Sequence, residues 1–271
     1  LYNKEGIDLH ILQMKSALAV AGLKAEGLDY ITPVGPSISA AAVGVPIKLI
    51  MVIGRSLPHS LYAKPPIKKV SDLKGKVIGV SGLTPGGEYY ALREIVKHYG
   101  LNPDKDVTII ASGPDMGVQA MAAGSVDGAM TAAIASVKAG EKGYVRLARV
   151  SDILDILSIG LTATDKKIQE NPADIKRMLR ATLTAFNYIK THKDEAIDIM
   201  VKDWGLERNG AIEVYESGVS AYSKDGTATD KAVMDQVDMA KSFGMTLRKD
   251  LNLSQLRDFT LLREVLKDLG L

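Results

Sequence analysis

The sequence predicts an α/β protein of two lobes, each with a mainly parallel sheet flanked by helices. Apolar runs of strand length alternate with helical segments, which is the pattern of βαβ units. A related phrase occurs at residues 23–29 and again at 121–127, where an Ala-bearing helix end leads to an Asp that enters a strand. With 271 residues, of which 46% are hydrophobic and 24% charged, the chain is long enough for two cores.

The first lobe is expected to begin with a β-α-β-α-β order. Alternation of apolar and polar residues indicates a half-buried strand, and a near-continuous apolar run is typical of a strand buried on both faces of a parallel sheet. The expected elements are a strand at Ile7–Leu12, a helix at Ser16–Leu23, a strand at Tyr30–Val34, a helix from Pro36 to near Gly44, and the buried strand Val45–Ile53.

A second α/β unit is expected after Pro65-Pro66, and the chain turns helical after Pro172. The stripe Ile175, Met178, Leu179, Thr182, Leu183, Phe186 and Ile189 indicates one face of a core helix. The other expected elements are strands at Val77–Val80, Val107–Ala111, Asp127–Met130 and Tyr144–Val150, helices at Tyr89–Tyr99 and after Pro114, and C-terminal helices at Ala232–Phe243 and Leu256–Leu269.

Composition excludes several classes of function. The formal charge of +2 comes from scattered residues, so there is no electrostatic footprint for nucleic acid or a membrane surface. No apolar run approaches the roughly 18–20 residues that cross a bilayer. The chain has no cysteine, which excludes disulfides, thiolate catalysis and zinc-thiolate sites. It opens at Leu1, so we expect that a segment upstream has been removed.

Catalytic and metal motifs are absent from the sequence. The four histidines have no metal-ligand spacing, and there is no nucleophile elbow, phosphate-binding lysine loop or dinucleotide fingerprint. Asp29 and Asp127 each enter a strand, away from the end where a site should lie, so turn or capping roles are expected for them. The sequence predicts no cofactor and no bound metal.

Three junctions instead indicate a binding site. In each, a strand-like run ends in a small residue followed by proline and a helix, so the N-terminus of the helix opens at the carboxyl end of the strand. Free N–H groups and the helix dipole converge there, although well-made βα turns would look the same. The junctions are Val34-Gly35-Pro36-Ser37, Leu83-Thr84-Pro85-Gly86-Gly87 and Ser112-Gly113-Pro114-Asp115.

These features resemble a family, the solute-binding proteins of ABC transporters for nitrate, sulfonate, taurine and thiamine-precursor-like compounds. The resemblance spans nearly the whole chain and rests on Leu1–Asp8, Gly35-Pro36-Ser37, Val70-Ser71-Asp72-Leu73-Lys74-Gly75-Lys76 and Met121–Ala129. It implies the type II periplasmic-binding fold, with lobe one at 1–62 plus 164–271, lobe two at 63–163, and a ligand cleft between the lobes. Crossings are expected near Leu61–Lys64 and Gly160–Thr164.

By position, the resemblance implies ligand contacts at the strand ends. Serine and threonine hydroxyls would donate hydrogen bonds, and glycines would expose backbone N–H groups. Glu88 and Asp115 are each expected in the first turn of a helix at the site, where they would repel a second negative charge on the ligand. A zwitterion, a neutral heterocycle or a mono-anion is therefore expected rather than a polyanion. The implied residues are Gly35, Pro36 and Ser37 in lobe one, and Ser81, Gly82, Thr84, Gly113, Pro114 and Thr131 in lobe two.

The resemblance implies a monomeric receptor that is not an enzyme. It would be periplasmic or extracellular, with a lipid anchor on a removed N-terminus as a further possibility, and would capture a small solute by lobe closure for a membrane permease. Two alternatives stay open. One is an enzyme on the same fold, either a small-acid lyase with Glu88 as its base or a relative of thiamine-pyrimidine synthases, whose cysteine motif this chain lacks. The other is the ligand-sensing domain of a transcription regulator.

Overall fold

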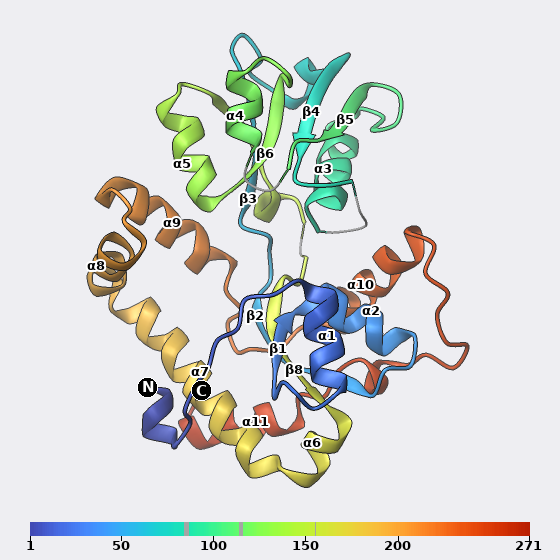
Figure 1. Cartoon of the computed structure of the whole chain (residues 1–271), viewed down its shortest axis with the longest axis vertical. Helices are drawn as coiled ribbons and strands as arrows, with labels where there is room; N and C mark the ends of the chain where they lie inside the picture. The colour runs from blue at the N-terminus through green and yellow to red at the C-terminus, as the bar shows by residue number, and fades with distance from the viewer. Residues whose placement is uncertain (84–86, 114–115, 155) are drawn as a thin grey trace. The chain divides into compact units, whose positions relative to one another are not determined.

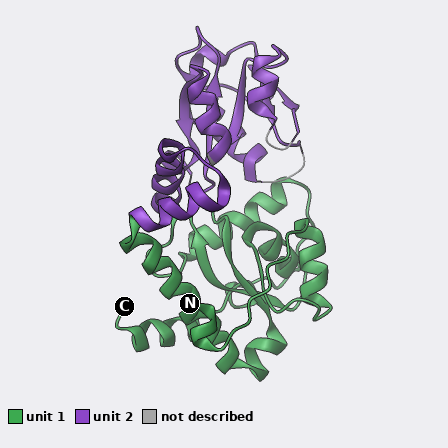
Figure 2. Ribbon diagram, turned by 60° about the vertical axis from the view of Figure 1, so that its left-hand side comes forward, with its two compact units in different colours: residues 1–55, 156–193, 222–271 green, residues 56–155, 194–221 purple. Residues whose placement is uncertain are grey.

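The computed structural model describes residues 1–83, 87–113, 116–154 and 156–271, so the predicted site residues Thr84 and Pro114 lie outside the described residues. The chain forms two compact units (Figure 2). Unit 1 comprises Leu1–Arg55, Ile156–Lys193 and Tyr222–Leu271; unit 2 comprises Ser56–Asp155 and Asp194–Ala221.

The unit boundaries differ from those expected, and the chain passes between the units four times. Helices α8 (Lys193–Trp204) and α9 (Arg208–Ala221), which the sequence assigned to lobe one, belong almost entirely to unit 2. Packing explains the difference, because α9 lies against α5 (Ala133–Glu141) and Arg146 pairs with Glu213 at 3.0 Å. The expected crossings at Leu61–Lys64 and Gly160–Thr164 lie mostly within strands.

Unit 1 is built on a three-stranded sheet in the order β1-β8-β2. Its strands are β1 (Ile31–Pro33), β8 (Ile159–Thr164) and β2 (Ile47–Gly54) (Figure 1). β8 is antiparallel to both neighbours, so the mainly parallel sheet expected for the first lobe is wrong. The apolar run at 45–53 is nevertheless buried, because β2 packs against helices on either side of it in sequence, α2 (Val34–Ala42) and α11 (Thr260–Leu269).

Helices build the core of unit 1 around this sheet. Most of the predicted stripe on α7 is buried, from Ile175 to Leu183, and Pro172 occupies the first turn, where its missing N–H costs nothing. Phe259 is the largest fully buried side chain. The helices are α1 (Ser16–Lys24), α2, α6 (Asp165–Glu170), α7 (Pro172–Thr191), α10 (Asp230–Ser242) and α11, with 3₁₀ turns at Tyr2–Glu5 and Leu253–Gln255.

The strand expected at Ile7–Leu12 does not form. The segment has no regular secondary structure and lies in no sheet, and Ile11 and Leu12 are 82% and 64% exposed. An alternating pattern becomes a strand only when a neighbouring strand satisfies its backbone. No strand of the described part of the chain pairs with this segment, so the alternating pattern does not produce a strand here.

Unit 2 contains a five-stranded sheet in the order β5-β4-β6-β3-β7. β4 is parallel to β5 and to β6, as expected, whereas β3 is antiparallel to β6 and β7. The strands are β3 (His59–Ala63), β4 (Lys76–Val80), β5 (Val107–Ala111), β6 (Gly128–Ala132) and β7 (Val145–Arg149); the helices are α3 (Gly87–His98), α4 (Gly117–Ala122), α5, α8 and α9, with 3₁₀ turns at Val70–Leu73 and Val150–Asp152.

The parallel strands of unit 2 bring three loops to one edge of the sheet. β4, β5 and β6 run in the same direction, so the segments that follow Val80, Ala111 and Ala132 share that edge. Asp127 lies at the opposite end, where its carboxylate accepts a hydrogen bond from the backbone N–H of Val77 at 3.0 Å. The structural role expected for Asp127 is therefore confirmed.

Candidate functional site

A cavity of about 180 Å³ opens at the carboxyl ends of the parallel strands of unit 2. Three of the predicted residues, Ser81, Gly113 and Thr131, line it together. We call it the strand-end pocket, and its remaining lining residues are His59, Glu88, Gly117, Met130, Ala132 and Ala135. Whole-ligand pockets usually measure about 300–1,000 Å³, so this one has room for a small solute or for one end of a larger solute.

Ser81 is fixed by Glu88, which lies in the first turn of α3. One carboxylate oxygen accepts the backbone N–H of Ser81 at 3.1 Å, and the other accepts its hydroxyl proton. The carboxylate therefore ties the loop after β4 to the start of α3. The sequence placed Glu88 beside the site, but the partnership with Ser81 depends on tertiary structure.

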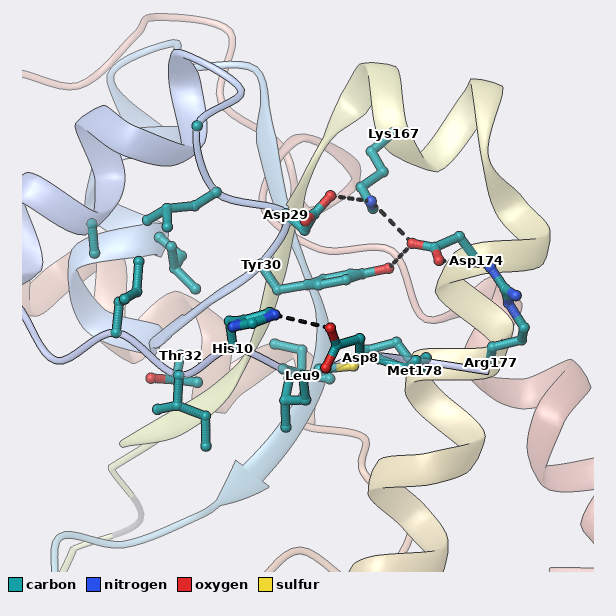
Figure 3. A pocket seen from close by; sticks show the side chains of 18 of the residues that line it. Asp8, Leu9, His10, Asp29, Tyr30, Thr32, Lys167, Asp174, Arg177 and Met178 are labelled. Carbon is teal, nitrogen blue, oxygen red and sulfur yellow. Dashed lines mark hydrogen bonds and ion pairs between the residues drawn. The ribbon is translucent and has the colours of Figure 1, made fainter. Parts of the chain in front are cut away.

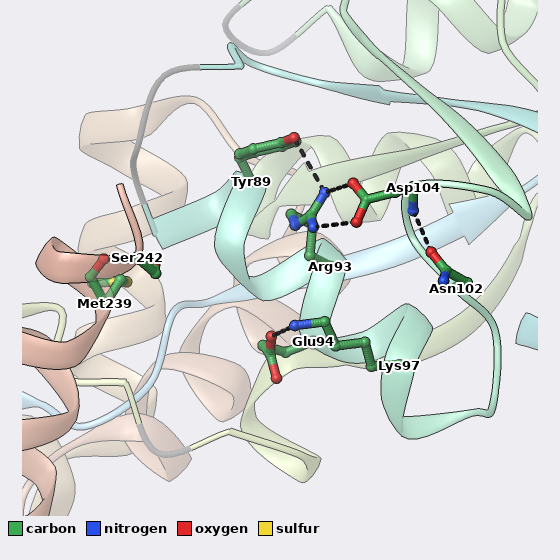
Figure 4. Close-up of polar contacts among 8 residues, drawn as sticks. All are labelled: Tyr89, Arg93, Glu94, Lys97, Asn102, Asp104, Met239 and Ser242. Carbon is green, nitrogen blue, oxygen red and sulfur yellow. Dashed lines mark hydrogen bonds and ion pairs between the residues drawn. The ribbon is translucent and has the colours of Figure 1, made fainter. Parts of the chain in front are cut away.

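Salt bridges anchor the rest of α3. Arg93 donates to both carboxylate oxygens of Asp104, at 2.6 and 2.9 Å, and Asn102 accepts the N–H of Asp104 at 2.9 Å (Figure 4). The hydrogen bonds from Arg93 lower the pKa of the exposed Asp104 carboxyl below its ordinary value. This clamp holds α3 to the segment before β5 and so steadies the helix that carries Glu88.

Thr131 lies at the end of β6 and is only 2% exposed. Its hydroxyl lies 3.3 Å from the carbonyl oxygen of Ser60 and 2.9 Å from the hydroxyl of Ser136. Ser136, on α5, also donates to the carbonyl of Thr131 at 3.3 Å. Neither Ser60 nor Ser136 was predicted from the sequence, because the contacts join α5 and β3 to β6.

Two glycines shape the other wall. Gly113 has a backbone φ of +93°, which residues other than glycine rarely adopt. Gly117 begins α4 so close to β6 that a Cβ atom there would lie 2.8 Å from Cβ of Ala129 and 3.0 Å from the carbonyl oxygen of Met130. Gly82 follows Ser81 but is not part of the lining.

In unit 1, the predicted residues Gly35, Pro36 and Ser37 lie in the first turns of α2, which begins two residues earlier than expected, at Val34. Ser37 is 1% exposed, and its hydroxyl donates to the carbonyl of Pro33 at 2.7 Å. This bond uses the hydroxyl proton, so the side chain can offer a solute only lone pairs. Its assignment as a ligand contact stays a prediction.

Gln236 of α10 packs against the same helix start and was missed by the sequence reasoning. Its side chain is 3% exposed, and Oε1 would lie 3.3 Å from a Cβ atom built on Gly35. Within the described residues, Oε1 has no hydrogen-bond partner. A buried amide oxygen without a partner is costly, which makes Gln236 a candidate for contact with a bound polar group. A glutamine in an amphipathic helix carries no sequence signal that could have revealed it.

Unit 1 also contains a larger hollow of about 800 Å³, lined in part by residues 7–12 (Figure 3). Charged groups on its wall satisfy one another: Tyr30 donates to Asp174 at 2.7 Å, and Lys167 lies 3.0 Å from Asp174 and 2.6 Å from Asp29. Asp29 is therefore an ion-pair partner of Lys167, and the turn or capping role expected for it stays a prediction. These pairs tie the residues just before β1 to α6 and α7.

Burial and pairing shift the pKa values in this cluster. Burial, reinforced by the hydrogen bond to Asp174, raises the pKa of the Tyr30 phenol. Burial also works to raise the pKa of Asp174, but hydrogen bonds from Tyr30 and Lys167 outweigh it and lower the value. The cluster is thus built around a charged Asp174 and a neutral Tyr30.

Within the described ranges, no three His, Asp or Glu side chains gather as metal ligands would, and no helix there is both long and apolar enough to cross a membrane. We place the candidate site at the strand-end pocket because it lies where parallel α/β sheets bind ligands and because its polar groups converge on the cavity. The charged side chains of Asp29, Lys167 and Asp174 on the wall of the larger hollow pair with one another instead.

Comparison with solved structures defines the class of fold. The chain aligns with a putative sulfonate ABC transporter protein, the periplasmic sulfonate-binding protein SsuA from Methylobacillus flagellatus KT, with a TM-score of 0.79 at 19% identity. The alignment covers 99% of this chain and 84% of that one. The fold is therefore that of the periplasmic binding proteins, which confirms the predicted α/β periplasmic-binding fold.

A family model described as NMT1/THI5 like matches residues 1–196, well over half of the sequence. The chain belongs to the NMT1/THI5-like family. It is 30% identical over 209 residues to a putative aliphatic sulfonates-binding protein of Bacillus subtilis, covering 73% of this chain and 60% of that protein. It is 26% identical over 184 residues to the riboflavin-binding protein RibY of Chloroflexus aurantiacus, covering 65% of this chain and 51% of that protein. The chain thus spans little more than half the length of these relatives.

Proposed function

We propose that the protein is the extracytoplasmic solute-binding receptor of an ABC importer, which captures a small solute and delivers it to a membrane permease. The strand-end pocket is the observation that carries this proposal. Ser81, Thr131 and Glu88 converge on a small cavity at the sheet edge where α/β proteins hold ligands. The relatives named as sulfonate-binding and riboflavin-binding proteins support a role in binding.

The proposal includes the absence of catalysis. A lyase on this fold would need a general base, and the Glu88 carboxylate already holds Ser81 through two hydrogen bonds. The hydroxyls of Thr131 and Ser136 bond to each other and to backbone carbonyls. These groups position a ligand rather than attack one.

A thermal-shift screen tests the proposal. Protein stripped of ligand by unfolding and refolding is exposed to nitrate, taurine, alkanesulfonates, aminopyrimidines, amino acids, flavins and small carboxylates. A ligand at about 100 times its dissociation constant adds roughly 2.7 kcal/mol to stability. For domains of this size that is a rise in Tm of about 5–10 °C.

A second assay separates binding from turnover. Each solute that raises Tm is incubated with the protein and then recovered by chromatography. A receptor returns the solute unchanged, and a set of hits confined to one chemical class supports the proposal. Steady consumption of a hit, or no hit across the panel, contradicts it.

A further inference from the structure

We propose that the strand-end pocket selects the positively charged, hydrogen-bond-donating end of its solute, such as an ammonium or amidinium group, and rejects sulfonate and nitrate anions. This rests on the proposed function and names the solute class for the same site. It follows from where the hydroxyl protons of the pocket go and from the charge on its wall.

Ser81 presents an acceptor to the cavity. A serine hydroxyl has one proton and two lone pairs, and this proton is donated to Glu88. The N–H of Ser81 is also donated to Glu88, at 3.1 Å. Ser81 therefore has no proton left for a solute, and its oxygen offers lone pairs only. A sulfonate or nitrate oxygen, which can only accept, gains nothing from it.

Thr131 gives the same result. Its hydroxyl proton goes either to the carbonyl of Ser60 or to the hydroxyl of Ser136. Ser136 in turn donates either to Thr131 Oγ1 or to the carbonyl of Thr131. Each arrangement spends both protons on protein acceptors. The hydroxyl of Thr131 is thus a second acceptor, and a donor on the solute is needed to use it.

Charge points the same way. Glu88 is the one carboxylate among the described lining residues, and no lysine or arginine stands among them. An anion placed here would meet the like charge of Glu88 with no described lysine or arginine in the lining to balance it, whereas a cation would meet an opposite charge. Gly113 and Gly117 line another wall and add no charge to it.

Matched pairs of ligands test this inference. Benzamidine is compared with benzenesulfonate, and ethylamine with ethanesulfonate, by calorimetric titration near pH 8. In each pair the carbon skeleton is similar and the charge is reversed. The expected result is at least tenfold tighter binding of the cation.

Variants locate the effect. Glu88→Gln keeps an oxygen that can accept from Ser81 but removes the charge, and should weaken benzamidine binding at least tenfold. Glu94→Gln is the control, since it removes one carboxylate from the same helix at a position paired with Lys97 outside the pocket. It should leave benzamidine binding unchanged, and far-UV circular dichroism checks that both variants fold.

The outcomes separate the two proposals. Tighter binding of the sulfonates by the wild-type protein, or equal benzamidine affinity in Glu88→Gln and Glu94→Gln, overturns the selectivity while leaving the receptor function in place. No binding by either member of both pairs, together with silence across the wider solute screen, overturns both.

Discussion

The contact between α4 and β6 makes a single methyl group at Gly117 a sensitive probe of the strand-end pocket. In Gly117→Ala the new Cβ would lie 2.8 Å from Cβ of Ala129, whereas ordinary contact begins at 3.4 Å. Helix α4 must therefore retreat by about 0.6 Å, the difference between these values. The second neighbour, the carbonyl oxygen of Met130, belongs to the strand backbone and cannot rotate away.

The expected loss of stability follows from that retreat. Overpacking a well-packed contact costs about 1–3 kcal/mol, and the better helix propensity of alanine returns up to about 1 kcal/mol. We expect a net loss of about 1–2 kcal/mol. Gly140→Ala is the matched control, because Gly140 lies in α5 of the same unit, and a Cβ atom there meets nothing within 4 Å. The free energy of unfolding of that variant should rise by a few tenths of a kcal/mol to about 1 kcal/mol, because alanine favours the helix more than glycine does.

Denaturant unfolding followed by far-UV circular dichroism and by Trp204 fluorescence measures both variants. Trp204 is the single tryptophan and lies in unit 2 with both glycines, so its signal reports on the relevant unit. Gly117→Ala should also weaken solute binding, because the displaced helix forms part of the pocket wall. If Gly117→Ala is as stable as Gly140→Ala and binds solute normally, α4 does not pack on β6 as described, and the argument for the pocket fails.

Three further predictions concern unit 1. Gly160→Ala should lower the free energy of unfolding by more than about 3 kcal/mol, because the new Cβ atom would overlap the carbonyl oxygen of Met51 and lie 2.8 Å from the side chain of Leu49. Denaturant unfolding measures this loss, and an unfolding midpoint equal to that of the wild type contradicts it. Gln236→Leu should preserve or raise Tm, because it removes a buried amide whose oxygen lacks a described partner, while lowering solute affinity in calorimetry; unchanged affinity removes Gln236 from the candidate site. Asp174→Asn should flatten the acid side of the stability profile. The pKa of Asp174 is lowered in the folded state, so its stabilisation is present above the ordinary carboxyl value of about 3.9 and is lost as pH falls through the folded value. Parallel acid profiles for variant and wild type would refute that reasoning.

Local patterns in the sequence were enough to predict most elements. The apolar run at 45–53 forms β2, and most of the stripe on α7 lies in the core. Burial of apolar side chains is the main driving force for folding, so these segments are buried whichever strands or helices they pack against. Strand pairing was less predictable. Ile7–Leu12 has a strand pattern but no partner, and β8 enters its sheet antiparallel because of where the chain returns, which no local pattern encodes.

The candidate site was also predicted only in part. The family resemblance implied Ser81, Gly113 and Thr131 as site residues, and they line one cavity because parallel strands carry their ends to one edge. The partners that decide their chemistry, Ser60 and Ser136 for Thr131 in particular, come from other elements and were not predicted. The sequence suggested hydroxyl donors, whereas the structure shows that the protons of these hydroxyls are already committed.

The most direct test of the central claim is a map of amide chemical-shift changes when the strongest solute from the screen is titrated into isotopically labelled protein. We predict that the changes centre on Ser81, Gly113, Gly117 and Thr131, which surround the strand-end pocket. Changes confined to the hollow of unit 1, around Tyr30 and Asp174, would contradict the account.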